Sequence, residues 1–176
     1  APDVILAAYS GLSRSDYVTL SQIAPVIAYP QAPWSTDWRE TIRFDSAGMG
    51  MAPDGEALIA DIEQKIAAEV AKYPELKGKR AMFVTHLDAT DLSIVNFYTT
   101  QDTRVRFFAD LGLSMPKSVM QASTTGSFAG SISAEQIDLF DDVDILVTYG
   151  DQALIDAMKA NPLLSHMPAV KHDAIV

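Results

Sequence analysis

The sequence contains no cysteine among its 176 residues. This absence excludes disulfide bonds, thiolate metal ligands and cysteine nucleophiles. Basic residues are also scarce, since 13 Lys and Arg stand against 23 Asp and Glu, and the net charge of −10 repels a nucleic-acid backbone. No apolar run approaches the roughly 20 residues that a membrane-spanning helix needs. The apolar content of 48% nevertheless predicts a folded chain with a core, and we expect no nucleic-acid partner.

The motifs of common enzymes are missing as well. The sequence has no Gly-x-Ser-x-Gly elbow, no Walker loop and no Gly-x-Gly-x-x-Gly motif, and the segment 126–130 places its Ser one position too early for a nucleophile. No isolated pair of carboxylates stands out as a general acid and base. An ordinary hydrolase or kinase is therefore disfavoured.

Two short apolar segments with similar sequences indicate an α/β fold. Residues 3–10 read Asp-Val-Ile-Leu-Ala-Ala-Tyr-Ser, and residues 144–150 read Asp-Ile-Leu-Val-Thr-Tyr-Gly. Such runs are typical of parallel strands, and the ligands of parallel sheets bind beyond the carboxyl ends of the strands. We therefore expect functional residues in the segment 9–13 and around Tyr149.

The first half of the chain predicts a β-α-β unit followed by two helices. Ser13 is suited to cap a helix over residues 14–22, and a second strand is expected at 26–29. Thr36 is expected to cap a helix that ends at Gly48 and Gly50. A longer helix is predicted over residues 53–73, with an apolar stripe on one side and charged residues on the other. The stripe consists of Leu58, Ile62, Ile66 and Val70.

The second half predicts another α/β unit. Its expected strands cover residues 81–85, 95–98 and 144–148, with a final short strand near Ala169. Its expected helices cover residues 102–111, 133–140 and 151–159. Residues 123–131, rich in Ser, Thr and Gly, are expected to form a loop.

Aromatic and arginine side chains gather in two segments of this acidic chain. The first holds Trp34, Trp38 and Arg39, and the second holds Tyr98, Arg104 and Arg106. Guanidinium groups bind oxyanions and aromatic rings stack on flat groups, so the two segments together suit a bulky, anionic, ring-bearing ligand. The alternative is structural, with Trp38 in the core and with Arg39 or Arg43 paired to Glu40 or Asp45.

One further cluster carries metal-binding side chains. His86, Asp88 and Asp91 follow a predicted strand, and an imidazole with two carboxylates can hold a divalent ion. The same residues also form turns and cap loops, which is the competing interpretation.

Several segments resemble one known family. Residues 151–171 are very similar to the corresponding stretch of ferric-enterobactin-type iron-siderophore substrate-binding proteins of ABC importers. Residues 33–39, 102–112 and 133–147 resemble the same family, so the resemblance covers essentially the whole chain.

The resemblance implies a fold class and a domain organisation. Members are α/β proteins of the class III periplasmic binding type, in which two Rossmann-like lobes are joined by a long helix. It implies that residues 1–50 are a remnant of the N-terminal lobe, 51–76 the bridging helix and 77–176 an incomplete C-terminal lobe. Because family members are considerably longer, we expect a fragment or processed form.

The resemblance also implies a function. Family members capture ferric siderophores without catalysis, so we expect a monomeric, extracytoplasmic component of an ABC importer, periplasmic or lipid-anchored, that needs no cofactor. The matching ligand-binding candidates are Trp34, Trp38, Arg39, Tyr98, Arg104 and Arg106, with Tyr9 added from its place after a strand. Glu135 matches the second-lobe Glu that docks on the permease, and Ser133 and Gln136 are expected to form a capping box beside it.

Two other functions stay open from the sequence. One is a metal-ion or cobalamin-type binding protein of the same fold, which would use His86, Asp88 and Asp91. The other is an α/β enzyme, which is least favoured because no nucleophile is recognisable.

Overall fold

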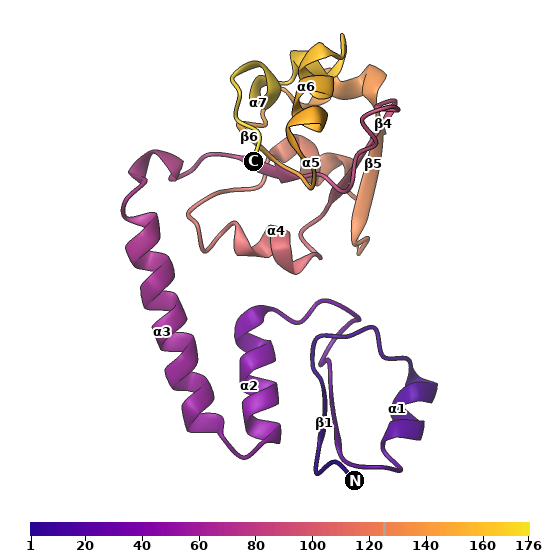
Figure 1. Cartoon of the computed structure of the whole chain (residues 1–176), viewed down its shortest axis with the longest axis vertical. Coiled ribbons are helices and arrows are strands. Elements are labelled where there is room, and N and C mark those ends of the chain that lie inside the picture. Colours follow the sequence, from indigo (N-terminus) through magenta and orange to yellow (C-terminus); the bar gives the residue numbers. More distant parts are fainter. Residues whose placement is uncertain (125) are drawn as a thin grey trace. The chain divides into compact units, whose positions relative to one another are not determined.

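The computed structural model describes residues 1–124 and 126–176, and it divides the chain into two compact units (Figure 1). The first unit is Ala1–Glu69 and the second is Val70–Val176. Each unit contains its own strands and helices, so the expectation of an α/β fold is confirmed. The bridging role of the long helix stays a prediction.

The first unit opens with the predicted β-α-β arrangement. Its elements are β1 (Ile5–Ala7), α1 (Arg14–Leu20), β2 (Val26–Ala28), α2 (Trp38–Gly48) and α3 (Ala52–Val70). Strands β1 and β2 pair in parallel, with Ile5 opposite Val26. Ser13 caps α1 as predicted, because its hydroxyl oxygen accepts a hydrogen bond from the backbone N–H of Asp16 at 3.1 Å.

Helix α2 begins one residue later than expected. Asp37, not Thr36, is the N-cap, and it forms a capping box with Glu40. Thr36 is buried, and its hydroxyl donates to the carbonyl of Ala8 at 2.6 Å. Thr36 therefore fastens the start of α2 to the end of β1, while the stronger acceptor caps the helix.

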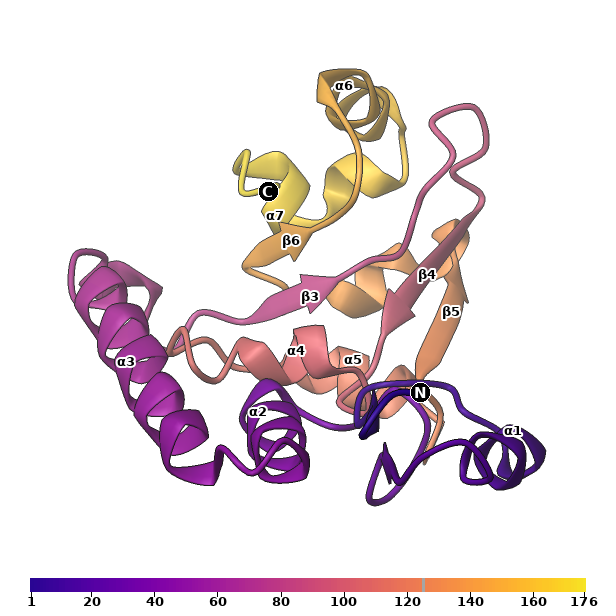
Figure 2. The same cartoon turned by 60° about the horizontal axis from the view of Figure 1, so that its bottom comes forward.

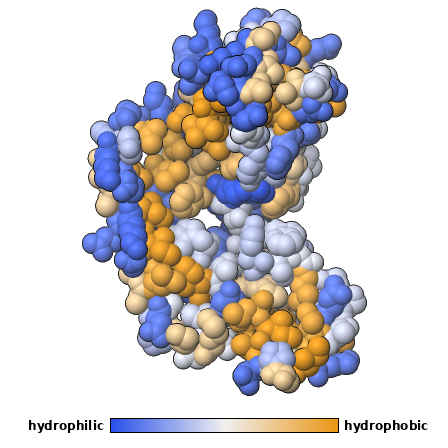
Figure 3. All heavy atoms as spheres, viewed as in Figure 1, coloured by the Kyte–Doolittle hydropathy of each residue, from blue (hydrophilic) through white to orange (hydrophobic). Residues whose placement is uncertain are grey.

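Helix α3 is the predicted long helix, and it is amphipathic. Its 19 residues span about 28 Å at about 1.5 Å per residue. Figure 3 shows one hydrophilic and one hydrophobic flank along it. The predicted apolar stripe is only partly correct, since Ile59 is buried and Leu58 is 48% exposed. Figure 3 also shows apolar surface over β1 and β2.

The second unit is larger and contains the main core. Its strands are β3 (Ala81–Phe83), β4 (Ile94–Tyr98), β5 (Ala129–Ser133) and β6 (Ile145–Val147). Strands β3 and β6 pair in parallel, and β4 and β5 pair antiparallel. A bridge between Val84 and Phe97 joins the two pairs, so β3 and β4 run side by side (Figure 2).

Helices and short 3-10 turns cover these strands. They are η1 (Pro74–Leu76), α4 (Thr103–Phe107), α5 (Lys117–Ala122), η2 (Ala134–Phe140), α6 (Gln152–Ala160), η3 (Leu164–His166) and α7 (Pro168–Lys171). The core beneath them includes Phe97 and Phe140, which are fully buried and meet edge to face with centroids 5.6 Å apart. Such a pair is a strong apolar anchor.

The structure differs from the expectations for this unit at several points. The segment near Ala169 is helix α7 and not a strand, and the C-terminal residues that follow it join β6 through a bridge between Leu146 and Ile175. The expected helix over 102–111 is α-helical only in α4. The expected loop over 123–131 contains the start of β5, and α5 was not expected at all. The segment 133–140 is a 3-10 helix, and Ser133 accepts from Glu135 N–H, not from that of Gln136.

Candidate ligand-binding site

Rings from separate segments of the second unit gather around the ends of its strands. Phe83 is the last residue of β3, Tyr98 is the last of β4, and Tyr149 follows β6. Because β3 and β6 are parallel, their carboxyl ends lie at one edge, where ligands of α/β sheets bind. We call this group the aromatic cluster, and it consists of Phe83, His86, Tyr98, Phe108, Phe128 and Tyr149.

Phe83 lies at the centre of the aromatic cluster. Its ring centroid is 5.5 Å from that of Tyr98, 6.1 Å from Phe108 and 5.4 Å from Tyr149. Tyr98 also meets Phe128 edge to face at 5.9 Å, and His86 stacks on Tyr149 at 4.6 Å. These distances are those of favourable ring pairs, so the rings hold one another in place.

Arg104 supplies the positive group of the cluster. Its guanidinium carbon lies 3.9 Å from the centre of the Tyr98 ring and 5.8 Å from that of Phe83. Nη1 donates to the hydroxyl of Tyr149 at 2.8 Å. Predicted residues Tyr98 and Arg104 are therefore brought together, and Tyr149 joins them as the repeated strand pattern suggested.

A buried carboxylate compensates the charge of Arg104. Both oxygens of Asp102 accept hydrogen bonds from the guanidinium, at 2.9 Å from Nε and 2.6 Å from Nη2. Asp102 is 0% exposed and also caps α4 by accepting from the backbone N–H of Arg104 at 2.7 Å. The hydrogen bonds to Asp102, and then to Tyr149, raise the pKa of Arg104 above its ordinary value, so this side chain stays cationic.

Arg104 keeps hydrogen-bonding capacity beyond these contacts. A guanidinium has five N–H donors, and within the described residues its side chain uses three of them, toward Asp102 and Tyr149. The side chain is 36% exposed. It can therefore donate to oxygen atoms of a ligand placed against the rings.

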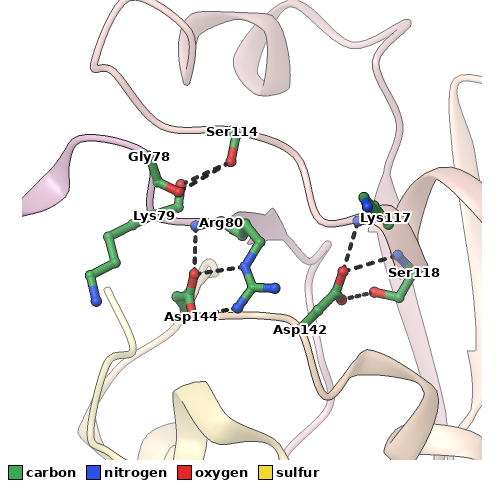
Figure 4. Close-up of polar contacts among 8 residues, drawn as sticks. All are labelled: Gly78, Lys79, Arg80, Ser114, Lys117, Ser118, Asp142 and Asp144. Carbon is green, nitrogen blue, oxygen red and sulfur yellow. Dashed lines mark hydrogen bonds and ion pairs between the residues drawn. The ribbon is translucent and has the colours of Figure 1, made fainter.

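The opposite end of the same strand pair holds a second ion pair. Arg80 precedes β3 and Asp144 precedes β6, and Arg80 donates to Asp144 from Nε at 2.9 Å and from Nη2 at 3.0 Å (Figure 4). The hydrogen bond from Arg80 lowers the pKa of Asp144 to about 2, although partial burial acts in the opposite direction. This pair ties two strands together and serves as a structural counterpart of Arg104 and Asp102.

The first unit holds the remaining predicted aromatics. Tyr9 and Trp34 meet edge to face at 5.4 Å, and both are exposed, at 41% and 48%. Trp34 has a φ of +60°, and its backbone N–H donates to the carbonyl of Ser10 at 3.0 Å. A side chain at Gly11 would lie 2.7 Å from the indole nitrogen, so this glycine makes room for the ring.

Trp38 and Arg39 lie at the start of α2. The guanidinium carbon of Arg39 is 4.2 Å from the centre of the Trp38 ring, and Nε pairs with Glu63 of α3 at 2.6 Å. The structure also corrects one alternative, because Arg43 pairs with Glu56 and not with Glu40 or Asp45. Arg106 is half-buried in α4, and its Nε is shielded from solvent.

In the turn that follows β3, the carboxylates accept hydrogen bonds from residues of the same turn. Asp88 accepts from the hydroxyl and backbone N–H of Thr90, and Asp91 accepts from the backbone N–H of Ser93. The side chain of Thr90 and then its backbone N–H lower the pKa of Asp88, and the side chain of Ser93 and then its backbone N–H lower the pKa of Asp91. Both line an open pocket of about 240 Å³ together with His86. Outside residue 125, no group of three or more His, Asp or Glu side chains is placed to hold a metal ion.

Glu135, the expected docking residue, is exposed in the first turn of η2. Ser133 accepts from its backbone N–H at 3.3 Å, which fixes the start of that turn. Its role toward a permease stays a prediction, as do the ligand-binding roles of the seven candidates.

Comparison with known proteins identifies the family. The family model for periplasmic binding proteins matches residues 1–176. The chain belongs to this family. No curated protein matches it in sequence. Among the parts of the chain that are described, no helix is long and apolar enough to cross a membrane.

Solved structures extend the comparison. The chain is 43% identical to PiaA of Streptococcus pneumoniae, crystallised in complex with ferrichrome, with a TM-score of 0.89 over 99% of this chain and 58% of that one. A second structure of PiaA, described as an iron uptake ABC transporter substrate-binding protein, gives 43% identity and a TM-score of 0.87 over 99% of this chain and 60% of that one. The chain thus spans less than two thirds of these relatives.

A more distant structure confirms the fold. SirA of Staphylococcus aureus is 21% identical, with a TM-score of 0.72 over 99% of this chain and 65% of that one. The predicted fold class, the Rossmann-like α/β fold of class III periplasmic binding proteins, is therefore confirmed. The sequence did not point to Phe83, Phe128 or Asp102. The signals that could have identified them are the places of Phe83 and Phe128 at strand ends and of Asp102 at a helix N-cap.

Proposed function

We propose that the protein containing this chain captures a ferric siderophore outside the cytoplasm and delivers it to an ABC importer. The observation that carries this proposal is the 43% identity, over 99% of the chain, to PiaA crystallised with ferrichrome. The TM-score of 0.89 shows that the two backbones agree over this length, and the proposal therefore takes a ligand of the same chemistry.

The aromatic cluster supports this function. A ferric siderophore is an organic shell around a metal whose ligands are oxygen atoms. The exposed part of Arg104 offers N–H donors to such oxygens, and Tyr98 offers a flat face beside them. Tyr9 and Trp34 present a second exposed ring pair in the first unit. We assign these residues to ligand contact.

We also propose that the protein is not an enzyme and that it acts as a monomer. A capture protein needs a rigid, prearranged set of contacts, and the rings of the aromatic cluster hold one another in such an arrangement. We expect the protein to release the chelate without any chemical change to it. Mass spectrometry of the chelate after incubation measures this directly, and a cleaved or modified chelate would contradict it.

The binding test uses the full-length natural protein and three ferric chelates, which are hydroxamate, catecholate and carboxylate in type. Intrinsic tryptophan fluorescence reports Trp34 and Trp38, and we expect quenching by at least one chelate. Absence of binding to all three, by fluorescence and by calorimetry, would refute the proposal. Arg80→Ala is the matched control for Arg104→Ala, since Arg80 makes a similar bidentate ion pair away from the rings.

The docking test separates capture from delivery. Glu135→Ala is expected to lower siderophore-dependent iron uptake in cells while leaving chelate affinity unchanged. Gln136→Ala, on the neighbouring exposed position, is the control. Equal uptake by both variants and by the wild type would remove Glu135 from the proposal.

A further inference from the structure

Asp102 lies beneath the guanidinium of Arg104. Its side chain is fully buried, whereas that of Arg104 is 36% exposed. The carboxylate accepts three hydrogen bonds from Arg104, two from the guanidinium and one from the backbone N–H. A ligand on the aromatic cluster can therefore contact the guanidinium but not the carboxylate, which affects the ligand only through its charge.

The ion pair gives the cluster hydrogen-bond donors without net charge. The two opposite charges are joined at 2.6 and 2.9 Å, so the carboxylate offsets part of the field that the guanidinium exerts on a group placed on the exposed side. The stacking of the guanidinium on Tyr98 at 3.9 Å further fixes its plane. A guanidinium without this partner would present a full positive charge to the ligand.

The charge of ferric chelates differs by chemical class. Three hydroxamate groups carry one negative charge each and cancel the charge of the ferric ion, whereas three doubly charged catecholates leave an anionic complex. A site with compensated charge gains less Coulomb energy from an anionic chelate than a lone guanidinium would, yet binding there removes the same water from the chelate. Such a site favours the uncharged class.

We propose that Asp102 is a positioning residue that sets the charge preference of the site, so that uncharged ferric chelates bind in preference to anionic ones. This inference rests on the proposed function, because it takes a ferric chelate as the ligand. It differs from the expectation of an anionic ligand that the arginine content suggested, because Arg104 already has a buried counter-ion.

The test compares two chelates that share one iron-binding core. Ferrioxamine B acylated at its terminal amine with an acetyl group is uncharged, and the same molecule acylated with a succinyl group carries one carboxylate. Calorimetry on the full-length protein gives the ratio of the two affinities. We expect the wild type to bind the acetyl form at least as tightly as the succinyl form.

Asp102→Asn removes the negative charge at nearly constant volume. We expect the affinity ratio to move toward the succinyl form by about tenfold, which equals about 1.4 kcal/mol. The double variant Asp102→Asn with Arg104→Gln restores zero charge, and its ratio is expected to return to the wild-type value although both affinities are lower. Asp144→Asn, in the other ion pair, is expected to leave the ratio unchanged.

A purely structural role for Asp102 would lower both affinities together and leave their ratio constant in Asp102→Asn, and that result would overturn the inference. If Asp102→Asn does not fold, the affinity ratio of the wild type is the test. A clear preference of the wild type for the succinyl form would also overturn the inference. Failure of the wild type to bind either form or ferrichrome would instead refute the proposed function itself.

Discussion

The guanidinium carbon of Arg104 lies 3.9 Å from the centre of the Tyr98 ring. Tyr98 ends strand β4, and Arg104 lies in the first turn of α4, so a short connection brings ring and cation together. A contact of this kind between a cation and a partly exposed ring is worth about 1 kcal/mol. The Arg104 side chain is still 36% exposed, so a ligand can reach it.

Replacement of Tyr98 tests this contact. Tyr98→Ala removes the ring on which Arg104 rests and is expected to weaken ferrichrome binding about tenfold, because the guanidinium loses its fixed plane. Tyr98→Phe keeps the ring and is expected to bind within about twofold of the wild type. Calorimetry measures both. Equal affinities for all three proteins would show that the ring does not contribute.

Acid titration tests the ion pair of Arg80 and Asp144. The pKa of Asp144 is about 2 in the folded protein, below the value of about 3.9 for an unperturbed Asp. A lowered folded-state pKa stabilises the protein above the unfolded pKa, and this stability is lost as pH falls from about 4 to about 2. The difference in unfolding free energy between the wild type and Asp144→Asn should therefore shrink over that range. A difference that stays constant would contradict this assignment.

The start of helix α2 depends on its cap. Asp37 accepts a hydrogen bond from the backbone N–H of Glu40 at 2.8 Å, and Glu40 accepts in return from that of Asp37. Asp37→Ala is expected to lower the unfolding free energy by about 1 kcal/mol, whereas Asp37→Ser keeps an acceptor and costs less. Urea unfolding measures both. Equal losses would argue against the capping role.

Gly130 is required by the ring opposite it. Gly130 pairs across the sheet with Phe97, and a side-chain carbon at position 130 would lie 2.5 Å from the ring of this fully buried Phe. Gly130→Ala is expected to destabilise the second unit by about 1–3 kcal/mol, the usual range for overpacking. Ser131→Ala, on the exposed neighbouring position, is the control. Thermal unfolding measures the stability of both variants. Equal stability of the two would show that the structure accommodates a side chain at position 130.

Local signals in the sequence predicted the elements that depend only on local contacts. Ser13 caps α1 and the apolar spacing predicts α3. The helix predicted over residues 151–159 is α6, which Asp151 caps through the N–H groups of Ala153 and Leu154. The resemblance to siderophore-binding proteins then predicted the fold class that the comparisons confirm.

Elements that depend on distant partners could not be predicted in this way. Helix α5 has Pro116 at its N-cap, and the carboxylate that accepts from its first N–H groups is that of Asp142, from a segment before β6 (Figure 4). Strand β5 forms from a Ser/Gly-rich sequence because β4 supplies its hydrogen-bonding partner. The aromatic cluster has the same origin, since only the order of the strands brings Phe83 and Tyr149 together.

The role of Arg104 in ligand binding is measured by calorimetric titration of ferrichrome into the full-length protein and its Arg104→Ala and Arg80→Ala variants. We expect binding by the wild type, similar binding by Arg80→Ala, and a loss of about tenfold or more in Arg104→Ala, where charged hydrogen bonds to the ligand disappear. Equal affinity of the Arg104→Ala variant and the wild type would show that the Arg104 guanidinium does not bind the ligand.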